Sequence, residues 1–165
     1  MRVKLFLLPA YLGIACSLLF AGLHCSHGQD NDSDVEAENE PLNDIKLIAQ
    51  SAAIPSLKGE SPFVLRESWW KGNLKPGNAK LIQIQLFRRN EYQFWMAVPD
   101  VDAGLNLNVY NSEGEMVESE TVTFPETNVV STIVRPKATG LYYVRVSLKT
   151  TIDKNQDWAV IYAYR

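Results

Sequence analysis

Residues 142–148, YYVRVSL, and residues 158–164, WAVIYAY, place large apolar or aromatic side chains at every second position. Successive side chains of a β-strand point to opposite faces of a sheet, so this period of two predicts half-buried strands. The same alternation recurs in residues 80–88, 92–98 and 105–110. Weaker candidates for strands follow the same reasoning and lie at residues 63–66, 115–121 and 128–135.

Turn-forming strings separate these runs, as at Asp102-Ala103-Gly104 and at Asn111-Ser112-Glu113-Gly114. Residues 60–165 are therefore predicted to form an all-β domain, an antiparallel, jelly-roll-like β-sandwich of seven to eight strands. Gly114 is expected to close a hairpin, and the run 158–164 is expected to be an edge strand. No glycine-rich phosphate loop follows a strand and no βαβ alternation is visible, so the sequence does not favour a nucleotide-binding fold.

The N-terminal region resembles a secretion signal. Arg2 and Lys4 precede a run of 19 almost entirely apolar residues from Leu5 to Leu23, and Ser26-His27-Gly28 offers small residues for cleavage. We expect residues 1–28 to be a cleaved signal peptide and the protein to be periplasmic or extracellular. The alternative is an uncleaved, N-terminally membrane-anchored protein that faces outward, because 19 helical residues at about 1.5 Å each approach the thickness of a bilayer. We expect the protein to contact the membrane only if this segment is not cleaved.

Two segments connect the signal to the sandwich. Residues 29–40, QDNDSDVEAENE, hold six carboxylates and one large apolar side chain, so we expect an acidic, disordered spacer. Residues 41–54 carry apolar side chains at spacings of three and four, which predicts a short amphipathic helix. Pro55 is expected to end that helix.

Both histidines and both cysteines lie within residues 1–28. Residues 29–165 therefore contain no imidazole and no thiol, which excludes cysteine nucleophiles, Ser/His/Asp hydrolysis and internal disulfides there. Residues 1–28 also hold two of the 16 basic side chains and none of the 19 acidic ones, so the remainder has a formal net charge of −5. Such a surface repels nucleic acid. The sequence predicts a protein that is not an enzyme and has no cofactor.

Three segments resemble the bacterial pre-peptidase C-terminal domain: residues 70–77, WKGNLKPG; residues 105–114, LNLNVYNSEG; and residues 135–146, RPKATGLYYVRV. The resemblance covers about residues 68–165. It implies a small jelly-roll-like β-sandwich that is appended to secreted enzymes or exported alone, and it implies no activity.

Aromatic residues are the candidates for ligand binding. Sugar rings stack on exposed aromatic side chains, and Trp69, Trp70, Trp95 and Tyr143 are the residues we select. Trp95 and Tyr143 lie opposite the more apolar positions of their strands. The competing interpretation is that these rings fill or cover the core.

A calcium site is a further hypothesis. The resemblance implies an acidic segment that takes part in calcium binding, but this chain has Asn106 and Asn108 where acids are usual. Asp100 and Asp102 lie just upstream and would supply oxygen ligands together with Asn106. A solvated turn is the favoured interpretation, because amide oxygens carry no charge.

Two functions remain open from the sequence. The favoured one is a non-catalytic exported module that is structural or binds another exported protein. The alternative is a carbohydrate-binding module that uses exposed aromatic residues, in which case the partner is a glycan.

Overall fold

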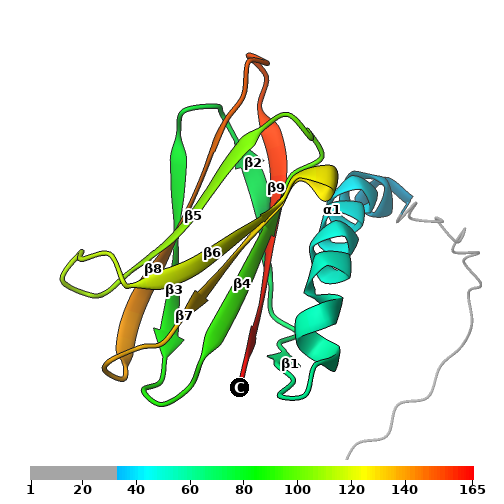
Figure 1. Ribbon diagram of the computed structural model, residues 1–165. Coiled ribbons are helices and arrows are strands. Elements are labelled where there is room, and N and C mark those ends of the chain that lie inside the picture. The colour runs from blue at the N-terminus through cyan, green and yellow to red at the C-terminus, as the bar shows by residue number, and fades with distance from the viewer. Residues whose placement is uncertain (1–32) are drawn as a thin grey trace, which may run out of the picture. The chain divides into compact units, whose positions relative to one another are not determined.

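A computed structural model describes residues 33–165, with side chains described from Asp44 onward. The predicted signal peptide lies outside the described residues, as do residues 29–32 of the predicted spacer. The described part contains one α-helix, nine β-strands and one 3-10 turn (Figure 1). Their bounds are α1 Ser33–Lys58, β1 Val64–Leu65, β2 Trp70–Leu74, β3 Ala79–Leu86, β4 Tyr92–Ala97, β5 Gly104–Tyr110, β6 Ser119–Phe124, η1 Pro125–Thr127, β7 Val129–Val134, β8 Gly140–Lys149 and β9 Gln156–Tyr164.

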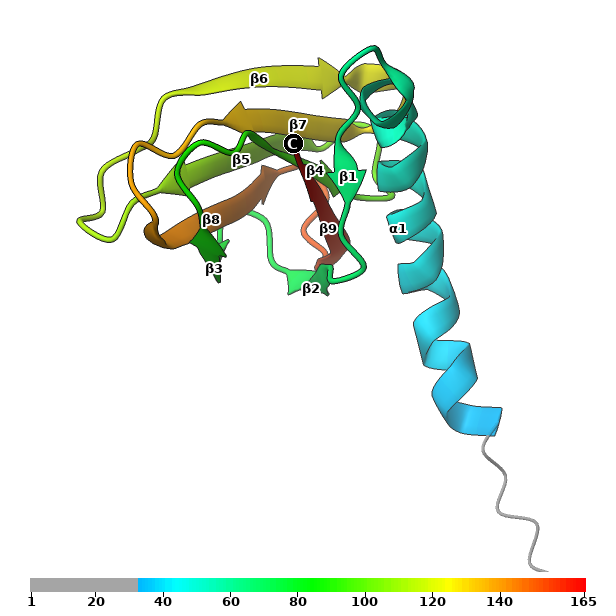
Figure 2. The ribbon, with the colours of Figure 1, turned by 90° about the horizontal axis from the view of Figure 1, so that it is seen from below.

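The strands form two antiparallel sheets, which confirms the predicted β-sandwich with a helix before it. The six-stranded sheet has the order β1-β9-β4-β7-β6, with β2 also paired to β9. The three-stranded sheet has the order β3-β8-β5. Helix α1 and the three-stranded sheet lie on opposite sides of the six-stranded sheet (Figure 2).

The main core fills the space between the sheets. Alternate residues of β3 are buried there, at Ile82, Ile84 and Leu86, as the period of two predicted. Phe94 of β4 and Val160 of β9 contribute from the six-stranded sheet. Burial of apolar surface contributes roughly 25 cal/mol per Å², so this layer is the main source of stability.

A second core lies between α1 and the six-stranded sheet. Every residue of β4 is buried, because the strand has the main core on one face and α1 on the other. Ile45, Ala49 and Ala53 recur every four residues along α1 and form one face of the helix. This face packs against Trp95 and Ala97 of β4.

Helix α1 is longer than the predicted 41–54. It begins at Ser33, within the predicted spacer, and continues to Lys58. Acidic residues favour the first turn of a helix, and the sequence SDVEAENE supplies several of them there. Pro55 does not end the helix. The last turn continues because Leu57 packs against the second core and the carbonyl of Ser56 accepts a 3.0 Å hydrogen bond from the amide of Phe63.

The strands differ from the prediction in two respects. Strand β2 was not predicted, because Trp70–Leu74 shows no clear alternation. The run 158–164 is not an edge strand, since β9 is paired with β4 on one side and with β1 and β2 on the other. The predicted hairpin at Gly114 is confirmed over a short stretch. An antiparallel bridge joins Tyr110 to Met116, and the amide of Val117 donates a 2.8 Å hydrogen bond to the carbonyl of Val109, before the chain crosses to the other sheet as β6.

Candidate functional site

Trp95 is not available to a ligand. It is 0% exposed and lies in the second core, beneath α1. The prediction that Trp95 is an exposed binding residue is therefore wrong. Alternation correctly placed Trp95 on the opposite face of β4 from Phe94, but it gave no sign that α1 covers that face.

Trp69 and Trp70 are both half-buried, and they lie on opposite sides of the six-stranded sheet. Trp69 packs against the second core, with the ammonium groups of Lys46 and Lys71 lying 4.8 and 5.5 Å from its ring centroid. Trp70 packs against the main core and stacks on Tyr162 at a centroid distance of 5.1 Å. The two residues do not form one binding surface.

Asp100, one of the predicted metal ligands, uses both carboxylate oxygens in local hydrogen bonds. Its Oδ1 accepts a hydrogen bond from the amide of Asp102 at 3.1 Å, and its Oδ2 accepts one from Thr150 Oγ1 at 2.8 Å. Asn106 lies beyond the turn, on the outer face of β5. Across the residues whose side chains are described, no group of three His, Cys, Asp or Glu side chains is placed to hold a metal ion. Asp100 thus acts as a turn-stabilising residue.

Tyr143 lies on the outer face of the three-stranded sheet. It is half-buried, and its neighbours in the register are Gln83 of β3 and Tyr110 of β5. This is the same face that carries Asn106. Tyr143 and Asn106, which were selected for two different sites, thus lie on one surface.

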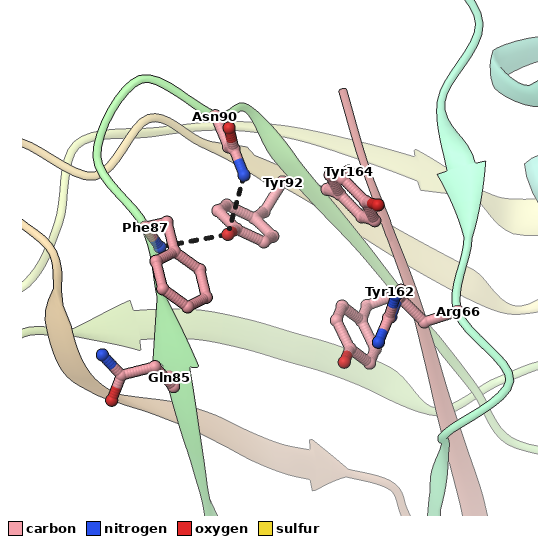
Figure 3. Close-up of a pocket in the computed structure, with 7 residues that line it drawn as sticks. All are labelled: Arg66, Gln85, Phe87, Asn90, Tyr92, Tyr162 and Tyr164. Carbon is pink, nitrogen blue, oxygen red and sulfur yellow. Dashed lines mark hydrogen bonds between the residues drawn. The ribbon is translucent and has the colours of Figure 1, made fainter.

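A cleft with a volume of about 390 Å³ opens between the end of β3 and the ends of β1 and β9 (Figure 3). We call it the aromatic cleft. Four of the seven residues that line it have aromatic rings, and the other three are an arginine and two amides. The lining residues are Arg66, Gln85, Phe87, Asn90, Tyr92, Tyr162 and Tyr164.

The aromatic wall of the cleft is held by ring contacts. Tyr162 and Tyr164 occupy the last inward positions of β9 and stay half-buried, at the open end of the sandwich. Tyr162 stacks on Phe94 at 5.7 Å as well as on Trp70, and Tyr164 contacts Tyr92 at 6.2 Å. Because each ring rests on another, the wall is formed before any ligand arrives.

The floor of the cleft is fixed by the hydroxyl of Tyr92. This oxygen accepts hydrogen bonds from the backbone amide of Phe87 at 3.0 Å and from the side-chain amide of Asn90 at 3.2 Å (Figure 3). Tyr92 itself is buried. The two bonds hold the connection between β3 and β4 against the cleft and keep the exposed ring of Phe87 at its rim.

Arg66 supplies the positive charge of the cleft. Its backbone amide donates a 3.0 Å hydrogen bond to the carbonyl of Tyr162, and its guanidinium carbon lies 5.6 Å from the ring centroid of Tyr164. Hydrogen bonding to the phenol of Tyr162 raises the pKa of Arg66 above its ordinary value. The guanidinium therefore stays charged at every physiological pH.

The cleft lining contains no carboxylate, imidazole or thiol. Glu91, which lies between the lining residues Asn90 and Tyr92, directs its carboxylate elsewhere. Its oxygens contact Arg135 at 2.6 Å and Arg165 at 3.0 Å, and its side chain is 16% exposed. The lining therefore offers a ligand aromatic rings, two side-chain amides and one guanidinium.

Neither protein-family models nor curated proteins give a match to this chain. The resemblance to the pre-peptidase C-terminal domain therefore stays a prediction. Within residues 33–165, no helix is both long enough and apolar enough to span a bilayer.

Sequence reasoning did not select the residues of the aromatic cleft. One signal was present: in the inward series of β9, Trp158 and Val160 are followed by Tyr162 and Tyr164 at the end of the strand. Tyrosine carries a polar tip on an apolar ring, so two tyrosines at the end of an inward series indicate a surface that is partly open to water.

Proposed function

We propose that this protein is a non-catalytic, exported carbohydrate-binding module and that the aromatic cleft is its binding site. The observation that carries the proposal is a preformed cleft in which tyrosine and phenylalanine rings face two amides and one guanidinium. Sugar rings present apolar C–H faces and a rim of hydroxyls. Aromatic rings complement the faces, and amide and guanidinium groups complement the hydroxyls.

The position of the cleft supports binding to a long ligand. It is open to solvent and lies at the edge of the sandwich, so a polymer can pass through it without threading its end. The ring of Phe87 comes from the connection that follows β3 and the ring of Tyr164 from β9, so they provide separate surfaces for stacking. These features favour a chain of sugars over an isolated small molecule.

The test is retention of the protein on insoluble cellulose, chitin and xylan, followed by a glycan array. Phe87→Ala and Tyr164→Ala each remove one ring, which costs roughly 1 kcal/mol and weakens binding about five-fold. Val122→Ala is the matched control, because Val122 is an exposed apolar residue of β6 outside the cleft. The proposal fails if no glycan is retained, or if the two cleft variants bind as the wild type does.

Export is tested separately by the N-terminal sequence of protein recovered from outside the cytoplasm. The proposal places the first residue near Gln29. Recovery of the protein with Met1 still attached contradicts cleavage and favours the anchored alternative.

Binding to another exported protein is the second candidate function, and one observation favours it. Strand β3 pairs with β8 alone, so the other edge of this eight-residue strand has no backbone partner among the described residues. An extended segment of another chain would pair with such an edge. Co-purification of an exported protein, together with slowed amide exchange in residues 79–86, would support this function, and unchanged exchange would contradict it.

A further inference from the structure

The outer face of the three-stranded sheet carries a second set of polar groups. We call it the Arg145 face and define it by six outward-pointing residues: Gln83, Asn106, Asn108, Tyr143, Arg145 and Lys149. The register places Arg145 beside Asn108, and Tyr143 beside Gln83. Directly opposed side chains on antiparallel strands have Cβ atoms about 4.5–5.5 Å apart, so these residues form one continuous surface.

The charge on this face is of one sign. Arg145 and Lys149 are the only charged side chains that point outward from β3, β5 and β8, although the whole chain has more acidic residues than basic ones. Arg145 is half-buried and donates a 3.0 Å hydrogen bond to Ser147 Oγ. Among residues 44–165, no carboxylate lies within ion-pair distance of Arg145. A half-buried guanidinium without a carboxylate partner is suited to receive one from a ligand.

A hollow of about 260 Å³ lies beside Arg145. Asn106, Asn108 and Lys149 line it as well. Within residues 44–165 the side-chain amides of Asn106 and Asn108 make no hydrogen bond. Two cations and two uncommitted amides thus surround one hollow, which is a donor-rich arrangement for a group that has both carboxylate and hydroxyl oxygens.

The Arg145 face is continuous with the aromatic cleft. Gln85 lines the cleft, lies on the outer side of β3 and is followed along that side by Gln83. Its register partner Leu141 begins the outward series of β8, which ends at Lys149. At about 3.3 Å per residue this series spans roughly 26 Å, enough for several sugar units in a row.

We propose that the Arg145 face binds the carboxylates of an acidic polysaccharide, one built from uronic acid units, as it leaves the aromatic cleft. This proposal rests on the proposed function and names its substrate class. The guanidinium of Arg145 forms paired hydrogen bonds with a carboxylate, and Lys149 adds a second positive charge. The amides bind hydroxyls, and the ring of Tyr143 stacks on a sugar.

The test compares polygalacturonate with its fully methyl-esterified form, which has the same backbone and no charge. Calorimetry on the wild type is expected to show tighter binding of polygalacturonate, and this preference is expected to shrink as salt rises. Arg145→Gln is expected to weaken polygalacturonate binding about ten-fold and to leave the methyl ester unaffected. Arg145→Lys keeps the charge but loses the fork, so it is expected to give an intermediate loss.

Two further variants separate this proposal from the proposed function. Lys58→Gln is the matched control, because it removes one exposed positive charge from the end of α1, on the other side of the six-stranded sheet. Tyr164→Ala is expected to weaken both polymers, since it removes a ring of the cleft. The melting temperature of each variant is measured first, and binding is compared only among variants that melt as the wild type does. A loss of binding then does not reflect a loss of folding.

Equal affinity of the wild type for the two polymers overturns the proposal, and so does unchanged polygalacturonate binding by Arg145→Gln. Tyr164-dependent binding of neutral glycans alone overturns the acidic substrate class and leaves the proposed function standing. A protein that binds no polysaccharide overturns both.

Discussion

Gly72 of β2 is required by a ring on the neighbouring strand. A Cβ atom built on Gly72 would lie 3.0 Å from Cζ2, 3.2 Å from Cε2 and 3.3 Å from Nε1 of Trp158. Trp158 is buried in the main core, so its ring has no free space into which it can shift. Gly72→Ala therefore forces the indole against its core neighbours.

The expected cost follows from two opposing effects. Overpacking of a filled core destabilises the protein by about 1–3 kcal/mol. Alanine also lowers the conformational entropy of the unfolded chain relative to glycine, which stabilises the folded state by about 0.4–1 kcal/mol. The net loss of unfolding free energy is about 1–2 kcal/mol, and at about 4 °C per kcal/mol the melting temperature falls by about 4–8 °C.

The assay is urea denaturation and a thermal melt of Gly72→Ala beside Gly140→Ala. Gly140 lies in β8, and a Cβ atom there would meet no atom within 4 Å, so its substitution is expected to be neutral or slightly stabilising. Trp158→Phe in the Gly72→Ala background makes room and should recover part of the loss. Equal stability of the two alanine variants would refute the steric argument.

Three other variants or conditions test the same description of the molecule. Ala49→Glu buries a carboxylate against Trp95 beneath α1, so it should lower the free energy of unfolding, measured by denaturation, by about 3 kcal/mol or more. Leu47→Glu, on the exposed side of α1, should change that free energy little. Tyr92→Phe leaves the amides of Phe87 and Asn90 without their acceptor, and we expect a loss of about 1–2 kcal/mol and weaker glycan binding. Binding of a neutral glycan should not change between about pH 5 and pH 8. Residues 29–165 lack histidine, and the pKa of Arg66 is raised by its hydrogen bond to Tyr162, so its charge is kept throughout that range. A change of affinity across that pH range would show that another titrating group contacts the ligand.

The alternation of side chains predicted most of the sandwich. The run 92–98 corresponds to β4 at Tyr92–Ala97, and the run 105–110 corresponds to β5 at Gly104–Tyr110. These predictions succeed because period two is a local property of each strand. Strand β2 was not predicted because a distant contact determines one of its residues. The ring of Trp158, which lies 86 positions further along the chain, leaves no room for a side chain at Gly72.

The aromatic cleft could not be predicted from the alternation of side chains along single strands. Alternation shows which side of a strand a residue occupies but not what covers that side, and Trp95 was misjudged for this reason. The aromatic cleft joins Arg66, Phe87 and Tyr162, which come together only through the pairing of β1 with β9 and the position of the β3 edge. Tyr143 and Asn106, which the sequence assigned to two different sites, lie on one outward face because β8 and β5 pair within the same sheet.

Strands β4 and β9 each have a hydrogen-bonded neighbour on both edges and a packed layer on both faces. Amides in this position exchange with solvent only when the whole domain opens, so these two strands should be the last to take up deuterium. Tyr92, Tyr162 and Tyr164 are attached to this slowest-exchanging part of the molecule. The wall that meets a ligand is therefore as rigid as the fold itself, and little motion is left to be lost when the ligand binds.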